Sequence, residues 1–147
     1  MPTYMLTWNP RQERPANLDD GVAQVAQGNP YRCSWSAGNR KYLPLGSRVF
    51  LIRQGKPPKG IVVSGFSTSE PEPTNDPGDH SNYFDIDFTM VLRGEEGDIL
   101  PLEELQADPV LKEVNWGSQR GGVEFTEDQA HRLEVSWREF LQSVTVP

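Results

Sequence analysis

Trp35 lies between two serines, in the middle of a long stretch of the chain that has no acidic side chain. Residues 21–69 contain seven Lys or Arg and no Asp or Glu, although the chain of 147 residues has a formal net charge of −7. Cations can contact phosphates, and an aromatic ring can stack on an unpaired base, so this combination is typical of a protein that binds nucleic acid. The seven cations are Arg32, Arg40, Lys41, Arg48, Arg53, Lys56 and Lys59.

The charge pattern also has a different interpretation. A basic stretch of sequence need not form a basic surface in the folded protein, and a pI near 4.8 argues against a polyanion as partner. Residues 70–147 carry 18 acidic against five basic side chains. This acidic half is the working surface if the chain is a protein-interaction domain. Such a domain would show no salt-dependent binding to polyanions.

Other kinds of chemistry find little support in the sequence. Cys33 is the only cysteine, so the chain has no intrachain disulfide, fits a reducing cytoplasm, and favours a small buried side chain over a nucleophile at this position. With only His80 and His131 besides it, a zinc site is not expected. The phosphate-binding and hydrolase motifs are absent, so no cofactor, metal or catalytic residue is predicted. We also expect no membrane span and no signal peptide.

The elements that must position Trp35 can be read from the hydrophobic pattern. Residues 4–8 predict a first strand, and apolar residues at helical spacing predict a helix from Leu18 to Ala26, with Asn17 as N-cap. Two dense apolar runs, residues 48–53 and 61–66, predict a hairpin whose basic tip contains two prolines and is exposed.

The acidic half contains a polar loop, a strand and two helices. Residues 83–92 alternate, with Phe84, Ile86, Phe88 and Met90 facing one way, so Asp85 and Asp87 are assigned to a solvated strand face rather than to acid–base catalysis. A short helix is predicted over 102–106. A capping box at 126–129 begins a last helix, and its apolar face consists of Ala130, Leu133, Trp137, Phe140, Leu141 and Val144. This order indicates an α+β fold with a curved, barrel-like sheet.

Several blocks of the sequence resemble the EVE domain of the PUA-like superfamily, which is related to YTH and SRA readers. They are residues 4–10, 34–39, 46–55, 60–65, 100–102 and 114–117. The similarity covers nearly the whole chain and is greatest to the N-terminal domain of restriction endonucleases that join an EVE domain to an HNH nuclease. No HNH motif is present. The resemblance implies one PUA-like domain over residues 1–147, with a mixed sheet or partial barrel flanked by helices.

The resemblance also implies where a modified base would bind. YTH-type readers hold a flipped base between aromatic side chains, one of them in a Trp-Ser pair after the first helix, and Trp35 and Ser36 match that pair. Asn9 matches an asparagine that contacts the base, and Phe88 is the nearest match to a second cage aromatic. Trp8, Tyr83 and Trp116 are the alternatives for that second wall.

Core packing competes for these aromatic side chains. Trp137 is assigned to the core because it lies on the apolar face of the last helix. A core position is also favoured for Trp8, while Trp116 fits a packing role and a site role equally. Trp35 is favoured as the base platform, because its neighbours are polar and leave it partly exposed.

The sequence therefore predicts a module that reads DNA with a flipped modified base, 5-methyl- or 5-hydroxymethylcytosine, without chemistry of its own. Its place would be in a modification-dependent restriction or defence system in the cytoplasm, with a nuclease as fused or separate partner. The predicted contacts to the nucleic-acid backbone are Arg40, Lys41, Arg53, Lys56 and Lys59. An RNA-binding PUA-like module is the other nucleic-acid hypothesis, which a preference for the 2′-hydroxyl would identify.

Overall fold

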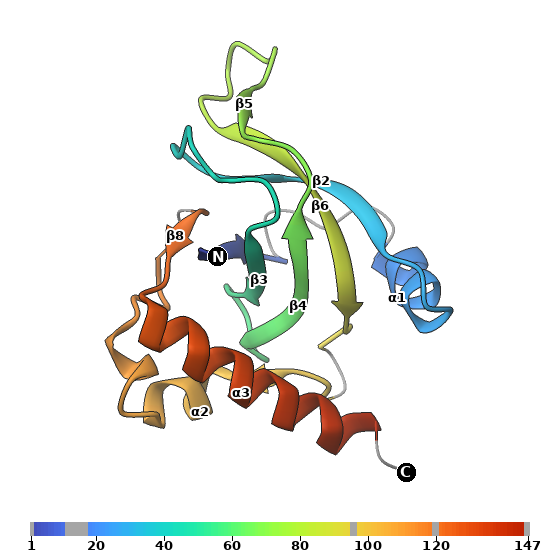
Figure 1. Cartoon of the computed structure of the whole chain (residues 1–147), viewed down its shortest axis with the longest axis vertical. Helices are drawn as coiled ribbons and strands as arrows, with labels where there is room; N and C mark the ends of the chain where they lie inside the picture. Colours follow the sequence, from blue (N-terminus) through green and yellow to red (C-terminus); the bar gives the residue numbers. More distant parts are fainter. Residues whose placement is uncertain (1, 11–17, 95–96, 119–120, 146–147) are drawn as a thin grey trace.

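The centre of the protein is an open, curved, mixed β-sheet (Figure 1). The computed structural model describes residues 2–10, 18–94, 97–118 and 121–145. Six strands follow one another in the order β2-β6-β4-β3-β1-β8, while β5 pairs with β6 and β7 pairs with β4. The strands are β1 (Thr3–Trp8), β2 (Tyr31–Ser36), β3 (Arg48–Arg53), β4 (Gly60–Ser67), β5 (Glu72–Pro73), β6 (Asn82–Val91), β7 (Leu100–Pro101) and β8 (Val123–Glu124).

The strand directions place the ends of β1 and β3 at the same edge of the sheet. These two strands are parallel, with Thr3 opposite Arg48 and Trp8 opposite Arg53, whereas every other pair is antiparallel. The predicted hairpin is formed by β3 and β4. Because β1 and β3 both end at this edge, the segments that follow them lie close together.

The sheet stays open, but it curls so far that β2, at one end, contacts β1 and the loop before β8. Trp35 on β2 donates a hydrogen bond from Nε1 to the carbonyl oxygen of Thr7 on β1 (3.2 Å), although three other strands separate β2 from β1 in the sheet order. The residues after β2 also contact the loop before β8. A Cβ on Gly121 would lie 2.7 Å from the oxygen of Ser36, and one on Gly122 would lie 2.7 Å from the oxygen of Ala37. Only glycine permits so close an approach of two backbones.

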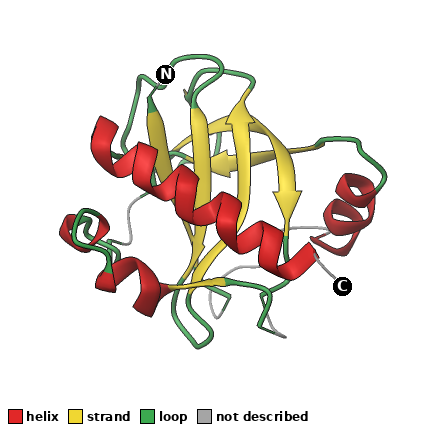
Figure 2. Ribbon diagram, turned by 60° about the horizontal axis from the view of Figure 1, so that its bottom comes forward, coloured by secondary structure: helices red, strands yellow, loops and turns green. Residues whose placement is uncertain are grey.

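Alternating side chains of the strands form a core on each face of the sheet. Leu6 and Leu51 belong to the inner core, which also contains Trp8, Trp35 and Phe88, while Met5 and Phe50 belong to the core on the other face. That second core is covered by α2 (Leu102–Ala107), η1 (Leu111–Glu113) and α3 (Glu127–Thr145), and Figure 2 shows α3 lying across the strands. The first helix, α1 (Leu18–Ala26), packs beside β2 and β6.

The three helices and the strands β1, β3, β4 and β6 agree with the predicted ones, with two local differences, whereas β2, β5, β7, β8 and η1 were not predicted. Phe84, Ile86 and Phe88 share the inner core as expected, but Met90 packs against the other core. The register between β4 and β6 shifts at Ser64/Gly65, and this irregularity reverses the alternation before Met90. Val144 was expected on the apolar face of α3 but is 41% exposed. The expected N-cap Asn17 lies outside the described residues.

Both hydrogen bonds of the capping box at the start of α3 are present. Thr126 Oγ1 accepts a hydrogen bond from the backbone N–H of Gln129 (3.2 Å), and Gln129 Oε1 accepts one from the backbone N–H of Thr126 (2.9 Å). Two backbone donors that the helix cannot satisfy are thereby paired.

Thr126→Ala is expected to lower the free energy of unfolding by about 1 kcal/mol, because the N–H of Gln129 loses its partner. Thr126→Ser retains the hydroxyl and serves as the control. Urea denaturation of the three proteins measures the effect. Equal stability of the alanine and serine variants would show that the box contributes nothing.

Candidate nucleic-acid interface

A polar cavity of about 400 Å³ lies where β1 and β3 end, next to the start of α2. Thr7 and Asn9 border it from the end of β1, and Arg53 and Gln54 from the end of β3. The backbone N–H of Gln54 donates to the oxygen of Trp8 (2.7 Å), so the parallel pairing extends one residue beyond the strands. No Asp or Glu is among the described residues that line the cavity. The other lining residues are Ile52, Gly55, Lys59, Leu102, Gln106, Trp116 and Gly117.

Asn9 is held against the hairpin by a glycine. Gly55 has φ +89°, which strains any other residue, and a Cβ there would lie 2.1 Å from Asn9 Oδ1, so a larger residue would displace the Asn9 side chain. The Asn9 amide therefore lies close to the backbone of the hairpin at the border of the cavity. Asn9 is the residue to which the resemblance assigned a contact with the base.

Arg53 lies in the wall of the cavity and is almost completely buried. The residue is 2% exposed, and its Nε and Nη1 have no hydrogen-bond partner among the described residues. Its guanidinium carbon lies 5.6 Å from the centroid of the Trp8 ring. No ion pair joins Arg53 to a carboxylate in the part of the chain that the structure describes. Among the described residues, no carboxylate compensates the charge of Arg53, although buried cations are usually paired.

Gln54 has a fixed orientation beside Arg53. Its Nε2 donates to the carbonyl oxygens of Trp116 (2.9 Å) and Ser118 (2.8 Å). Since both amide hydrogens are used, the oxygen and nitrogen of the amide are assigned unambiguously. Oε1 accepts no hydrogen bond from the described residues. The cavity wall therefore combines a fixed acceptor with a buried donor group.

The residues that were predicted to form the base pocket lie in three separate places in the structure. Only Asn9 and Trp116 line the cavity, and Trp116 itself is 4% exposed, with Nε1 donating to the oxygen of Leu111 (2.8 Å). Ser36 and Tyr83 are opposite each other on β2 and β6, away from the cavity lining. Ser36 Oγ accepts from the N–H of Gly38, and the Tyr83 hydroxyl donates to Asp79.

The remaining three predicted pocket aromatics, Trp35, Phe88 and Trp8, lie in the inner core. Trp35 is 8% exposed, and its ring centroid lies 6.5 Å from that of Phe88 at 58°. The expectation that Trp35 is partly exposed was wrong. On a strand with one buried face, the neighbours of an inward side chain point outward, so Ser34 and Ser36 indicate alternation rather than exposure of Trp35.

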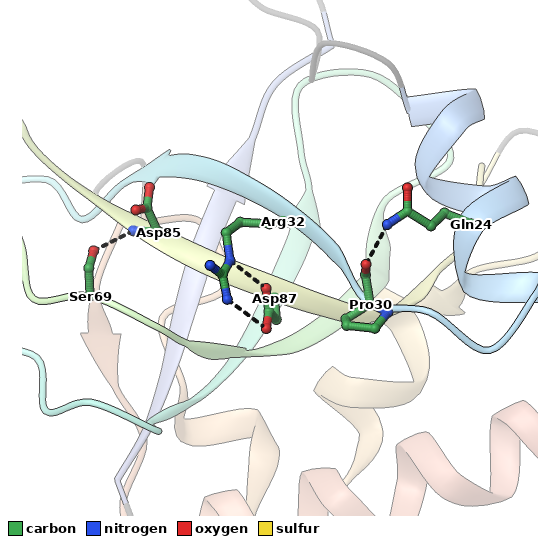
Figure 3. A network of polar contacts seen from close by, with 6 residues as sticks. All are labelled: Gln24, Pro30, Arg32, Ser69, Asp85 and Asp87. Atoms are coloured by element: carbon green, nitrogen blue, oxygen red, sulfur yellow. Dashed lines mark hydrogen bonds and ion pairs between the residues drawn. The ribbon is translucent and has the colours of Figure 1, made fainter.

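Residues 21–69 contain no acidic side chain, but in the fold they are contacted by acidic side chains from residues 70–147. β2 pairs with β6, so Arg32 lies opposite Asp87 and forms a two-pronged ion pair with it, Nε–Oδ1 2.9 Å and Nη2–Oδ2 3.2 Å (Figure 3). Arg48 pairs with Glu134 on α3 at 3.0 Å. Carboxylates of residues 70–147 therefore neutralise part of the basic stretch.

Of the five predicted backbone contacts, two are engaged inside the protein. Arg40 Nε donates to the oxygen of Gly122 (2.6 Å), and its guanidinium lies 4.7 Å from the Tyr4 ring centroid. Arg53 is buried. Lys41 and Lys59 are exposed and Lys56 is half-buried, and none of the three lysines forms an ion pair with a described residue. The exposed charge is thus concentrated in lysines, of which Lys59 borders the cavity.

Sequence reasoning missed Gln54 and Gln106 as cavity residues. A polar side chain directly after an apolar strand and before a glycine was the available signal for Gln54, because binding residues often follow the ends of strands. Gln106 lies on α2, and no comparable sequence feature marks it as a cavity residue. It lines the cavity only through the way that α2 packs against the sheet.

The chemistry of the described residues gives little support to catalysis. Burial, together with the negative charge of Asp85, raises the pKa of the Cys33 thiol to about 11, so the reactive thiolate is scarce at neutral pH. No group of three or more His, Cys, Asp or Glu side chains among the described residues could hold a metal ion. Within the same residues, no helix has the length and apolar character needed to cross a membrane.

Comparisons with known proteins identify the fold. No protein-family model matches the chain, and a search of curated proteins finds no match. Solved structures are similar over nearly the whole chain. The structure of human THYN1 in complex with 5-methylcytosine-containing DNA is 17% identical, with a TM-score of 0.62, and the match covers 92% of this chain and 98% of that one. A protein of Pseudomonas syringae is 16% identical, with a TM-score of 0.63 over 91% of this chain and 99% of its own. A hypothetical protein from Leishmania major is 16% identical, with a TM-score of 0.61 over 95% and 96%. The predicted PUA-like α+β fold is confirmed, and the resemblance to EVE domains holds at the level of the fold.

Proposed function

We propose that this chain, which has the fold of EVE-type PUA-like domains, binds DNA and accepts an extruded modified cytosine in the cavity at the ends of β1 and β3. The observation that carries the proposal is the cavity itself, which combines cations and amides and is lined by no acidic side chain among the described residues. Its volume of about 400 Å³ lies in the range of small-ligand sites. The similar structure of human THYN1 contains DNA with 5-methylcytosine.

The proposed interface has two parts with different roles. Lys41, Lys56 and Lys59 contact phosphates, which supplies affinity without sequence information. The cavity reads the edge of the flipped base. Binding requires no bond to be made or broken, so the chain acts as a reader. A place in a modification-dependent restriction system, with a nuclease as partner, remains a prediction from the resemblance.

The proposal is tested by titrating the protein with three duplexes that differ at one position, which holds 5-methylcytosine, cytosine or an abasic site. A buried methyl contributes about 0.8 kcal/mol, so we expect about fourfold tighter binding of the methylated duplex than of the unmodified one. The abasic duplex should bind more weakly still. Equal affinity for all three would refute base reading, and tighter binding of an RNA of the same sequence would favour the RNA hypothesis.

The contribution of the hairpin lysines is measured by salt dependence. Lys56→Ala combined with Lys59→Ala should reduce the slope of log K against log salt by about two units, because each phosphate contact contributes about 0.9. Methylated and unmodified DNA should lose affinity alike. Arg138→Ala removes an exposed cation on α3 and is the matched control. A slope that does not change would place the hairpin outside the interface.

A further inference from the structure

The β2–β3 loop, residues 37–47, carries an exposed aromatic ring beside an exposed cation. Tyr42 is 65% exposed, more than any other large hydrophobic side chain among the described residues. Lys41, directly before it, is exposed and forms no ion pair with a described residue. The charge of Arg40 is engaged, because its Nη1 lies 3.9 Å from Glu124 Oε1. The loop therefore offers one ring and one available ammonium group to a partner.

The backbone on both sides of Tyr42 is held in place. On one side, the carbonyl oxygen of Arg40 accepts a hydrogen bond from Asn82 Nδ2 (3.1 Å), and Arg40 Nε donates to the oxygen of Gly122 (2.6 Å). On the other side, Leu43 is completely buried in the inner core. A tyrosine on such a backbone has only two side-chain torsions to fix when it binds a partner. Binding through this ring therefore costs little conformational entropy.

An exposed ring beside a cation is the arrangement by which proteins hold unpaired bases. The sequence assigned this arrangement to Trp35, which is buried, whereas in the fold Tyr42 has it. A negatively charged strand fits the loop better than a protein surface does, because no described carboxylate neutralises Lys41. We infer that the β2–β3 loop is a second nucleic-acid contact, where the Tyr42 ring stacks on an unpaired base and Lys41 contacts the adjacent phosphate. The inference rests on the proposed function and extends the interface beyond the cavity.

The second contact lies away from the cavity. The loop leads into β3 at Arg48, whereas the cavity lies at the other end of this strand, beside Arg53. Figure 1 shows the loop and α2 at opposite ends of β3. The six residues of β3, at about 3.3 Å each, span about 20 Å, which is the length of about six base pairs. A nucleic acid that reaches both contacts therefore has its unpaired segment about six base pairs from the extruded base.

The test uses duplexes with single-stranded tails that differ only in their bases. Each duplex carries 5-methylcytosine about six base pairs from a short tail, which is placed at the 5′ end in one set and at the 3′ end in another. The tail consists of thymidines or of abasic residues, which have the same phosphates but cannot stack. In one of the two sets, we expect the wild type to bind the thymidine tail about fivefold to hundredfold more tightly than the abasic tail.

Variants of the loop separate stacking from charge and from apolar contact. Tyr42→Ala should bind the two tails equally, whereas Tyr42→Phe keeps the ring and should retain the preference for thymidines. Leu45→Ala is the matched control, because it removes a side chain of the same loop that is 62% exposed but has no ring. Lys41→Ala should weaken the binding of both tails alike and reduce the slope of log K against log salt by about 0.7, the contribution of one phosphate of a single strand.

The outcomes distinguish this inference from the proposed function. Equal binding of the two tails by the wild type would overturn the second contact and favour a protein as the partner of the loop. A Tyr42→Ala variant that still prefers thymidines would also overturn it, because the tail would then stack elsewhere. The proposed function is tested separately, by the preference of the wild type for 5-methylcytosine over cytosine in duplexes without tails. If that preference is absent but Tyr42 still selects the thymidine tail, reading in the cavity is overturned and the contact at Tyr42 stands.

Discussion

Trp137→Ala is expected to lower the free energy of unfolding by about 3–5 kcal/mol, a large fraction of the stability of a domain of this size. Trp137 is 2% exposed in the core between α3 and the sheet. Its ring is stacked on Phe140 at 5.9 Å and lies edge-on to Phe50 at 6.1 Å, and Nε1 donates to Ser64 Oγ at 3.0 Å. Truncation leaves a void, and it deprives the buried Ser64 hydroxyl of its donor.

Thermal and urea denaturation measure this loss. Tyr42→Ala is the matched control, because it removes an aromatic side chain that is 65% exposed and should change stability by less than about 0.5 kcal/mol. The sequence alone already assigned Trp137 to the core. A Trp137→Ala variant as stable as the Tyr42→Ala variant would contradict both the assignment and the packing of α3.

Trp35→Ala is expected to cost a similar amount, about 3–5 kcal/mol, which differs from what the sequence predicted. The side chain is 8% exposed, packs against Phe88, and ties β2 to β1 through the Thr7 oxygen. Its removal takes a large ring out of the inner core and breaks the hydrogen bond from Trp35 Nε1 to the oxygen of Thr7, which joins β2 to β1. The curl of the sheet should loosen as a result.

The experiment combines urea denaturation with a titration of methylated and unmodified duplex. Trp35→Phe keeps much of the volume but loses the N–H donor, so its stability should lie between that of the wild type and that of Trp35→Ala. A Trp35→Ala protein that keeps wild-type stability and loses only its preference for the methylated base would restore Trp35 as the stacking platform.

The sequence predicted the three helices and four of the strands, because the signals of these elements are local. The alternation of residues 84–88 and the capping box at 126–129 each depend on neighbouring residues, and both were confirmed. The lining of the candidate cavity could be predicted less well, because it depends on pairing between distant segments. Arg53 is charged and flanks an apolar run, which in sequence looks like an exposed cation. Its burial follows from the parallel pairing with β1 and from Gly94, whose missing side chain leaves room beside the guanidinium.

The burial of Trp35 could not be predicted from its neighbours in the sequence either. Polar neighbours around Trp35 are compatible with an exposed ring and with an inward position on a strand, and only the pairing partner decides between them. Across from Trp35, β6 supplies Phe84, so the ring faces the inner core. The charge pattern misled for a related reason, since Asp87 and Glu134 reach Arg32 and Arg48 from the other half of the chain.

The order of strands has a consequence for how this chain is made. β1 precedes the other strands of this sheet in the sequence, yet its neighbours in the sheet are β3 and β8, which are synthesised more than 40 and more than 110 residues after it. The contact of residues 36–38 with Gly121 and Gly122 likewise joins segments far apart in the sequence. Each of these long loops must close, at a cost in chain entropy, before the strands that it joins can pair. This slows folding. In an emerging chain the apolar strand Thr3–Trp8 therefore has no partner until β3 has been made, and its other edge stays unpaired until β8 follows. Retarding translation after β3 should allow β1 to pair earlier, whereas a pause before it should increase aggregation.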